Sequence, residues 1–276
     1  MPIDTDRTVP PQVSGARPVR AWAVQLVTAA VTLAIVVALW HFLTAVTGLI
    51  SPARFATPAE VGSAIRQIAV DGYSNGRLHQ HVLRSVLLVT MGFTVAASIG
   101  VALGLAMGAS RKVEALVNPV FLVLRPIPPL AWIPLAIVWL GLGDAAKMMV
   151  IFVSAFVPSV INSYTGVRQI DKPIFEAAAM LDVKGLRYWR EVLLPGALPS
   201  IFTGLRLSLQ ASWTTLVAAE LVGAINGLGQ ILNQAAQDIY PAMILVGMIG
   251  VALCGWLMTV GLGWVEKRVM PWKVIA

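Results

Sequence analysis

Three stretches of this sequence are long enough to cross a membrane and contain no charged side chain. Ser85–Ser110 has 26 residues, Met148–Val167 has 20 and Ile239–Val265 has 27, all without Asp, Glu, Lys or Arg. About 20 apolar residues in a helix span the hydrocarbon core of a bilayer. Charged residues make up 12% of the 276-residue chain, whereas a soluble domain carries roughly twice that share. The chain is therefore predicted to be an all-α membrane protein.

Hydropathy along the whole chain predicts six transmembrane helices. They are expected at residues 23–44, 85–108, 119–141, 147–165, 203–223 and 242–264. The first apolar run exceeds the roughly 7–15 residues of a signal-peptide core, so we expect it to be retained. Prolines at positions 126, 128, 129 and 134 interrupt the third span. Because proline removes a backbone donor, that span should break where protein or water satisfies the freed groups.

The distribution of Lys and Arg predicts that both termini are cytoplasmic. With this orientation the cytoplasmic stretches hold 13 Lys and Arg residues and the opposite loops hold four. The net charge of +7 is then explained by topology, and no nucleic-acid partner is expected. We expect a flexible cytoplasmic tail (1–20), a first transmembrane helix with its connection on the opposite side of the membrane (21–84), a core domain of five transmembrane helices (85–265) and a cytoplasmic C-terminal tail (266–276).

The largest cytoplasmic loop, residues 171–199, has the pattern of two short amphipathic helices. Asp171 is a plausible N-cap with Pro173 in the first turn. Apolar residues then recur at helical spacing on both sides of Gly185, and Pro195 precedes the next span. Such helices could lie on the membrane surface or dock on a soluble partner.

The residues Glu176-Ala177-Ala178, followed by Leu193-Leu194-Pro195, resemble the EAA loop of ATP-binding-cassette (ABC) importer permeases. Asp182 stands where that family usually has Gly, and Gly185 follows three residues later. Asp tolerates left-handed backbone better than most residues. The resemblance implies that Glu176, Ala177, Ala178, Asp182, Gly185, Leu194 and Pro195 contact the ATPase subunit.

Further segments between Ser85 and Lys273 resemble the nitrate/sulfonate/taurine branch of that family. They are LRPIPPLAWIPLAIVWLGLGDAAK (124–147), TGLRLSLQASW (203–213), VAAE (217–220), GLG (227–229) and EKRVMPWK (266–273). The resemblance implies a type I ABC importer permease fold in the bacterial inner membrane and a substrate from the nitrate, sulfonate and taurine class. It also implies cytoplasmic ATP-binding-cassette subunits, a second permease copy in a homodimer, and a periplasmic or lipoprotein substrate-binding protein.

The sequence contains no Walker A pattern, G-x-x-x-x-G-K-[ST], so MgATP is expected on a partner chain and no cofactor on this one. His79 and His81 cannot share a helical face, and no metal site or catalytic residue is expected. An ion-coupled secondary transporter or channel is the main alternative, and a polytopic membrane enzyme is a third. A secondary transporter or channel needs polar groups near the middle of the membrane. The predicted spans offer few of them beyond Asn162, Gln210 and Glu220.

Charged residues inside membrane spans are costly and often functional. Arg206, near the cytoplasmic end of its span, is expected to extend its head group to the interface. Glu220 is either an interfacial carboxylate paired within a dimer or part of an outer gate, and Arg125 either anchors the proline break or attracts an anion. The pathway and gate candidates are Arg125, Pro128, Pro129, Trp213 and Glu220. The line of Gly100, Gly104 and Gly108 predicts close helix packing.

Overall fold

The computed structural model describes residues 19–47, 51 and 54–272 of the chain, which divide into two compact units at Pro58. The first unit contains α1 (Val19–His41) and a π-helical turn, η1 (Phe42–Val46). Trp40 donates a hydrogen bond from Nε1 to the Ala56 carbonyl at 3.0 Å and packs edge-on against Phe55. The predicted first span corresponds to the apolar stretch Val27–Val46.

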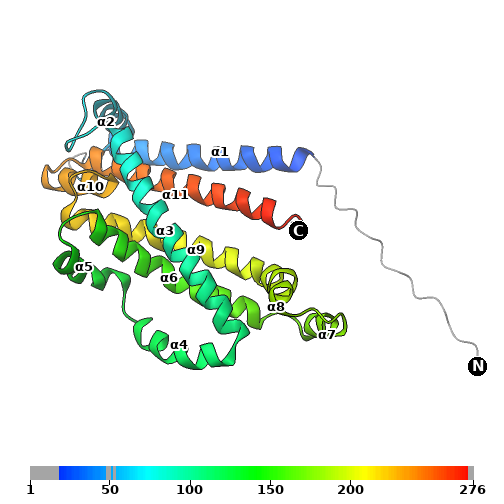
Figure 1. Cartoon of the computed structure of the whole chain (residues 1–276). Helices are drawn as coiled ribbons and strands as arrows, with labels where there is room; N and C mark the ends of the chain where they lie inside the picture. The colour runs from blue at the N-terminus through cyan, green and yellow to red at the C-terminus, as the bar shows by residue number, and fades with distance from the viewer. Residues whose placement is uncertain (1–18, 48–50, 52–53, 273–276) are drawn as a thin grey trace, which may run out of the picture. The chain divides into compact units, whose positions relative to one another are not determined.

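The second unit is also helical. It contains α2 (from Pro58 to Val70), α3 (Leu78–Ala109), α4 (Arg111–Leu124), η2 (Pro129–Trp132), α5 (Ile133–Leu140), α6 (Asp144–Arg168), α7 (Lys172–Met180), α8 (Gly185–Tyr188), η3 (Trp189–Leu193), α9 (Leu194–Gly223), α10 (Leu228–Gln237) and α11 (Pro241–Val269). The long helices α3, α6 and α9 pack side by side and form its centre (Figure 1).

Six spans are obtained if the bent pair α4 and η2–α5 counts as one. The two halves of this pair meet at 83°, so the predicted proline break in the third span is confirmed. The start of this span differs from the prediction, because α4 begins at Arg111 instead of near residue 119. The Ser110 side chain accepts a hydrogen bond from the Val113 amide at this N-terminus, which lets a charged first turn be helical.

Glycines on α3 set its distance from α6. A Cβ on Gly104 would lie 2.5 Å from the Val160 carbonyl oxygen, and one on Gly100 would lie 2.8 Å from the Ser159 Cβ. Both distances are shorter than real Cβ contacts. The predicted small-residue line is thus a contact within the subunit, where it lets two helix backbones approach closely.

Figure 1 shows α10 at one end of the α3, α6 and α9 layer and α7 with α8 at the other. The 171–199 segment and the 225–240 segment therefore lie at opposite ends of this helical layer.

Candidate functional site

The 171–199 segment contains the first of the two short helices that the sequence predicts, and its second helix is continuous with α9. Helix α7 begins after Asp171, with Pro173 in its first turn, although the Asp171 side chain makes no capping hydrogen bond among the described residues. The second helix differs from the expectation of a separate element. It runs through η3 into α9, so that Gly185–Gly223 is one helical stretch of 39 residues. Helix α8 is therefore continuous with a helix that is long and apolar enough to cross a membrane.

The turn between α7 and α8 explains why Asp182 can stand where the resembling family usually has Gly. The Val183 amide donates to the Ala178 carbonyl at 3.0 Å, and the Asp182 amide donates to the Ala179 carbonyl at 3.1 Å. These two bonds form the Schellman pattern, in which the residue after the C-cap adopts a left-handed conformation and is usually Gly. Asp182 occupies that position with φ 48°, and Gly185 has φ 60°. The aspartate thus adopts the backbone that a glycine would favour.

The α7–α8 turn exposes apolar side chains at its tip. Met180 is 87% exposed and Leu186 is 81% exposed. Glu176 and Ala177 are also exposed, whereas Ala178 is buried. An apolar tip with small residues beside it can enter a groove on another protein.

The base of the same segment is anchored in the transmembrane core. Leu193 is buried in a cluster with residues of α3, α6 and α9, and Phe175 and Tyr188 pack against this cluster. Leu194 is partly exposed and Pro195 half-buried at the start of α9. An exposed tip on a fixed base is the geometry that a coupling element requires.

At the other end of α9, Glu220 closes a buried hydrogen-bond network. Its side chain is fully buried. Ser85 donates from Oγ to Glu220 Oε1 at 2.8 Å, and the Gly229 amide donates to Oε2 at 2.6 Å. The Leu228 amide donates to the Ser85 hydroxyl at 2.9 Å. This network, which we call the outer lock, ties the first turn of α10 to both α3 and α9.

The glycines of the outer lock leave the space that the carboxylate occupies. Gly227 has φ 145°, and a Cβ there would lie 2.2 Å from Glu220 Oε1. A Cβ on Gly229 would lie 2.6 Å from the Glu220 Cβ. The Gly227 amide also bonds to His81 Nδ1 at 3.0 Å. The segments 217–220 and 227–229, separate in the sequence, therefore form one structural site, and His81 belongs to it.

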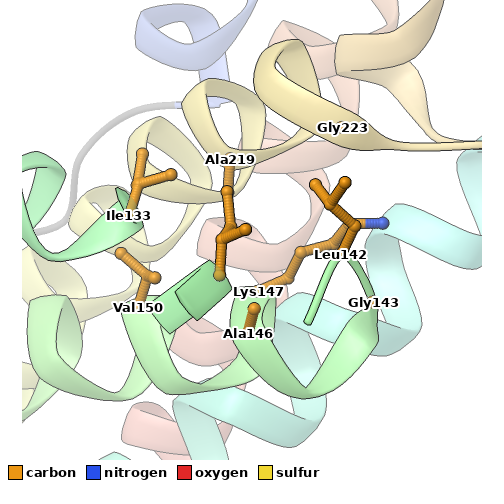
Figure 2. Close-up of a pocket in the computed structure, with 9 residues that line it drawn as sticks. Ile133, Leu142, Gly143, Ala146, Lys147, Val150, Ala219 and Gly223 are labelled. Atoms are coloured by element: carbon orange, nitrogen blue, oxygen red, sulfur yellow. The ribbon is translucent and has the colours of Figure 1, made fainter. Parts of the chain in front are cut away.

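Next to the outer lock, α5, α6 and α9 pack against one another. Figure 2 shows Ile133, Val150 and Ala219, one from each of these helices, lining a small pocket. The gap that they leave has a volume of only about 10 Å³. The nearby Lys147 is buried and lies 3.6 Å from Asp144, which also pairs with Arg84. The outer end of α9 is thus tightly packed within one subunit.

The break between α4 and η2 borders a larger cavity, with a volume of about 330 Å³. We call it the break cavity, and the described residues that line it come from α4, the break, η2, α6 and α9. Of the pathway candidates, Arg125 and Pro129 line it and Pro128 does not. Trp132 also lines it, and sequence reasoning did not select this residue, although its place beside the proline run was a usable signal.

The remaining candidate, Trp213, lies apart from the break cavity. It is buried and faces a groove between α9 and α11, where a Cβ on Gly255 would lie 3.7 Å from its Cδ1. The same groove is lined by Arg206, which pairs with Glu266 of α11. Arg206 was expected to extend to the membrane interface, which stays a prediction, and its partner Glu266 lies in the last turn of α11.

Residues 98–272 match the sequence family described as binding-protein-dependent transport system inner membrane component. The chain is 33% identical to the taurine transport system permease protein TauC of Escherichia coli K12, over 87% of this chain and 88% of that protein. It is 36% identical to the bicarbonate transport system permease protein CmpB of Synechococcus elongatus, over 70% of each chain. A putative aliphatic sulfonates permease protein of Bacillus subtilis, SsuC, is 31% identical over 87% of this chain and 85% of its own length.

The fold also matches a solved structure. A chain of the inward-facing MetNI methionine ABC transporter superposes with a TM-score of 0.60 and 21% sequence identity, over 70% of this chain and 95% of that one. This likeness confirms the predicted fold class, an all-helical fold with up to six membrane spans.

Proposed function

The chain belongs to the family of binding-protein-dependent transport system inner membrane components, and from this premise we infer that it imports a small oxyanion through a dimeric pathway. The chain is the permease subunit of an ABC importer, and a separate subunit hydrolyses ATP. The importer also uses a substrate-binding protein. The observation that carries the role of this chain is the continuity of α8, η3 and α9.

The α7–α8 turn is the contact with the ATPase in this proposal. Its exposed apolar tip, Met180 and Leu186, would enter a groove of the ATPase subunit, with Glu176 and Ala177 at the rim. Because α8 continues into α9, closure of two ATPase subunits on ATP would move α9 as a rigid lever. The helix dipole and charges at the tip play a smaller part, since the Asp182–Lys184 and Arg187–Glu191 pairs are exposed and such pairs contribute little.

The substrate in this proposal is a small oxyanion of the sulfonate and bicarbonate type. Its support is that the relatives named for taurine, sulfonates and bicarbonate align over 70% or more of this chain. Arg125, beside the middle of α6, is a cation at membrane depth of the kind that marks ion and substrate pathways.

Two copies of the chain would enclose the pathway, with both termini in the cytoplasm. The predicted excess of Lys and Arg on that side supports the orientation. The placement of α7 and α8 at the end opposite α10 agrees with it (Figure 1).

The test is uptake of radiolabelled taurine by proteoliposomes that contain this permease with the ATPase and binding protein encoded beside it. We expect uptake that needs internal ATP and external binding protein. An exchange of the ATPase catalytic glutamate for glutamine is the matched control. Uptake that persists with an ion gradient and no ATP would instead support the secondary transporter.

A further inference from the structure

The break cavity has the size and place of a ligand site. Its volume of about 330 Å³ is at the lower end of the range for small-molecule pockets. It lies beside Phe152–Pro158 in the middle of the 25-residue helix α6, so it is near mid-depth of that span. The cavity is therefore far from both ends of this helix.

The walls of the break cavity are mainly aromatic and aliphatic. Phe152 and Phe156 stack at a centroid distance of 5.4 Å, and Phe121 meets Phe156 edge-on at 6.5 Å. Electrostatic interactions are stronger beside such apolar walls than in water, because the local dielectric constant is lower. A single positive charge there has a large effect on which ions enter.

Three polar side chains line the break cavity, and each can donate a hydrogen bond. Arg125 forms no ion pair with the described residues. Trp132 Nε1 is buried and has no acceptor in the part of the chain that the structure covers. The Ser154 oxygen accepts a hydrogen bond from Thr215 Oγ1 at 2.8 Å, so its own hydroxyl hydrogen remains to be donated. None of the described lining residues is Asp or Glu.

A buried donor without an acceptor is destabilising, and a bound acceptor removes that cost. An oxyanion supplies several hydrogen-bond acceptor atoms. Its negative charge would pair with Arg125, which has no ion-pair partner among the described residues. A carboxylate or sulfonate also pairs well with the planar guanidinium group.

We propose that the break cavity is a transit site for a small oxyanion, with Arg125 supplying the charge and Trp132 and Ser154 supplying hydrogen bonds. The aromatic wall contacts the organic part of a sulfonate. One cation keeps the site weak, as conduction requires, since a solute must leave as readily as it enters. This inference rests on the proposed function and names the residues of this chain that meet the substrate class.

The test uses the charge selectivity of thiol modification inside the cavity. Val157, a lining residue, is changed to Cys in the full transporter, with Cys254 changed to Ala to remove the native thiol. Modification by a sulfonate-bearing methanethiosulfonate is compared with modification by its trimethylammonium analogue in each nucleotide state. We expect the anionic reagent to react faster, and we expect Arg125→Gln to lower the anion-to-cation rate ratio by at least tenfold.

Matched controls separate the cavity from general effects. Arg66→Gln removes an exposed positive charge on α2, and Trp139→Phe repeats the tryptophan change at an exposed position of α5. Neither control should change the anion-to-cation rate ratio. In the uptake assay, Trp132→Phe should lower taurine uptake per ATP hydrolysed several-fold, and Trp139→Phe should leave it unchanged. An unchanged ratio in Arg125→Gln, or no modification of Val157→Cys in any nucleotide state, would overturn the transit site.

The proposed function is measured separately on the same preparation. If the wild-type proteoliposomes take up taurine with ATP and only the rate ratio fails to change, the transit site is wrong and the importer stands. If the wild-type preparation takes up neither taurine nor bicarbonate with ATP, the proposed substrate class is wrong whatever the ratio.

Discussion

Removal of the Glu220 carboxylate should destabilise the protein far more than removal of an exposed glutamate. The carboxylate accepts hydrogen bonds from Ser85 Oγ at 2.8 Å and from the Gly229 amide at 2.6 Å. Each bond to a charged group contributes about 1.5–3 kcal/mol. Because both donors would remain buried without partners, we expect Glu220→Ala to lower the free energy of unfolding by about 3–5 kcal/mol.

The isosteric change Glu220→Gln tests the same reasoning with a smaller expected loss of stability. It keeps the volume and one oxygen, but its amide nitrogen cannot accept a hydrogen bond. Ser85 could reverse its role and accept from that nitrogen, since hydroxyl groups do both. We expect a loss of about 1–2 kcal/mol, near the value of one hydrogen bond.

The assay is SDS-induced unfolding in dodecyl maltoside, followed by tryptophan fluorescence. The matched control is Glu191→Ala, which removes an exposed pair with Arg187 and should cost less than about 1 kcal/mol. If Glu220→Ala unfolds at the same SDS fraction as Glu191→Ala, the outer lock does not stabilise the first turn of α10, and our description of it is wrong.

Three further predictions concern the tip of the coupling segment, its turn and the core. Glu176→Lys, or deletion of residues 176–190, should abolish ATP-driven uptake while membrane insertion, measured by fractionation, is retained; normal uptake would refute the coupling role. Asp182→Gly should stabilise the α7–α8 turn by about 0.5–1 kcal/mol, because Gly adopts φ 48° without strain, and slower hydrogen exchange at Val183 would show this. Gly104→Val should reduce the folded yield, because its side chain would meet the Val160 carbonyl at 2.5 Å, whereas Gly62→Ala, with nothing within 4 Å, should leave it unchanged or higher.

Much of the transmembrane framework could be predicted from the sequence, because span length and lack of charge are local properties. The break in the third span followed from its prolines, and the 83° bend between its halves agrees. The start of α4 was missed, since Arg111, Lys112 and Glu114 read as a loop although Ser110 caps them. A cap is a single residue and carries a weaker signal than a 20-residue run.

The site was predicted in parts and not as a whole. Glu220 was selected because a carboxylate within a span is unusual, but its partners Ser85 and Gly229 lie 135 and nine positions away. Periodicity gives the face of a helix and does not say which distant residue meets it. Trp132 was missed although it lies near the proline run, because only the folded chain shows that its Nε1 has no acceptor among the described residues and that it lines the same cavity as Arg125.

The Asp182 turn shows the opposite case, in which a local rule was sufficient. The expectation that Asp could take the left-handed backbone of the usual Gly rests on residue chemistry alone. The φ of 48° and the two bonds to Ala178 and Ala179 agree with it. Departures from a family pattern can thus be judged from the conformation that the position requires.

The most direct test of the central claim is purification of the tagged chain in mild detergent, with mass spectrometry of the proteins that accompany it and an ATPase assay. We predict recovery of a subunit with a Walker A motif and vanadate-sensitive ATP hydrolysis, both lost when residues 176–190 are removed. A chain that is isolated without any ATPase, also after crosslinking, and that catalyses uptake driven by an ion gradient would contradict the account.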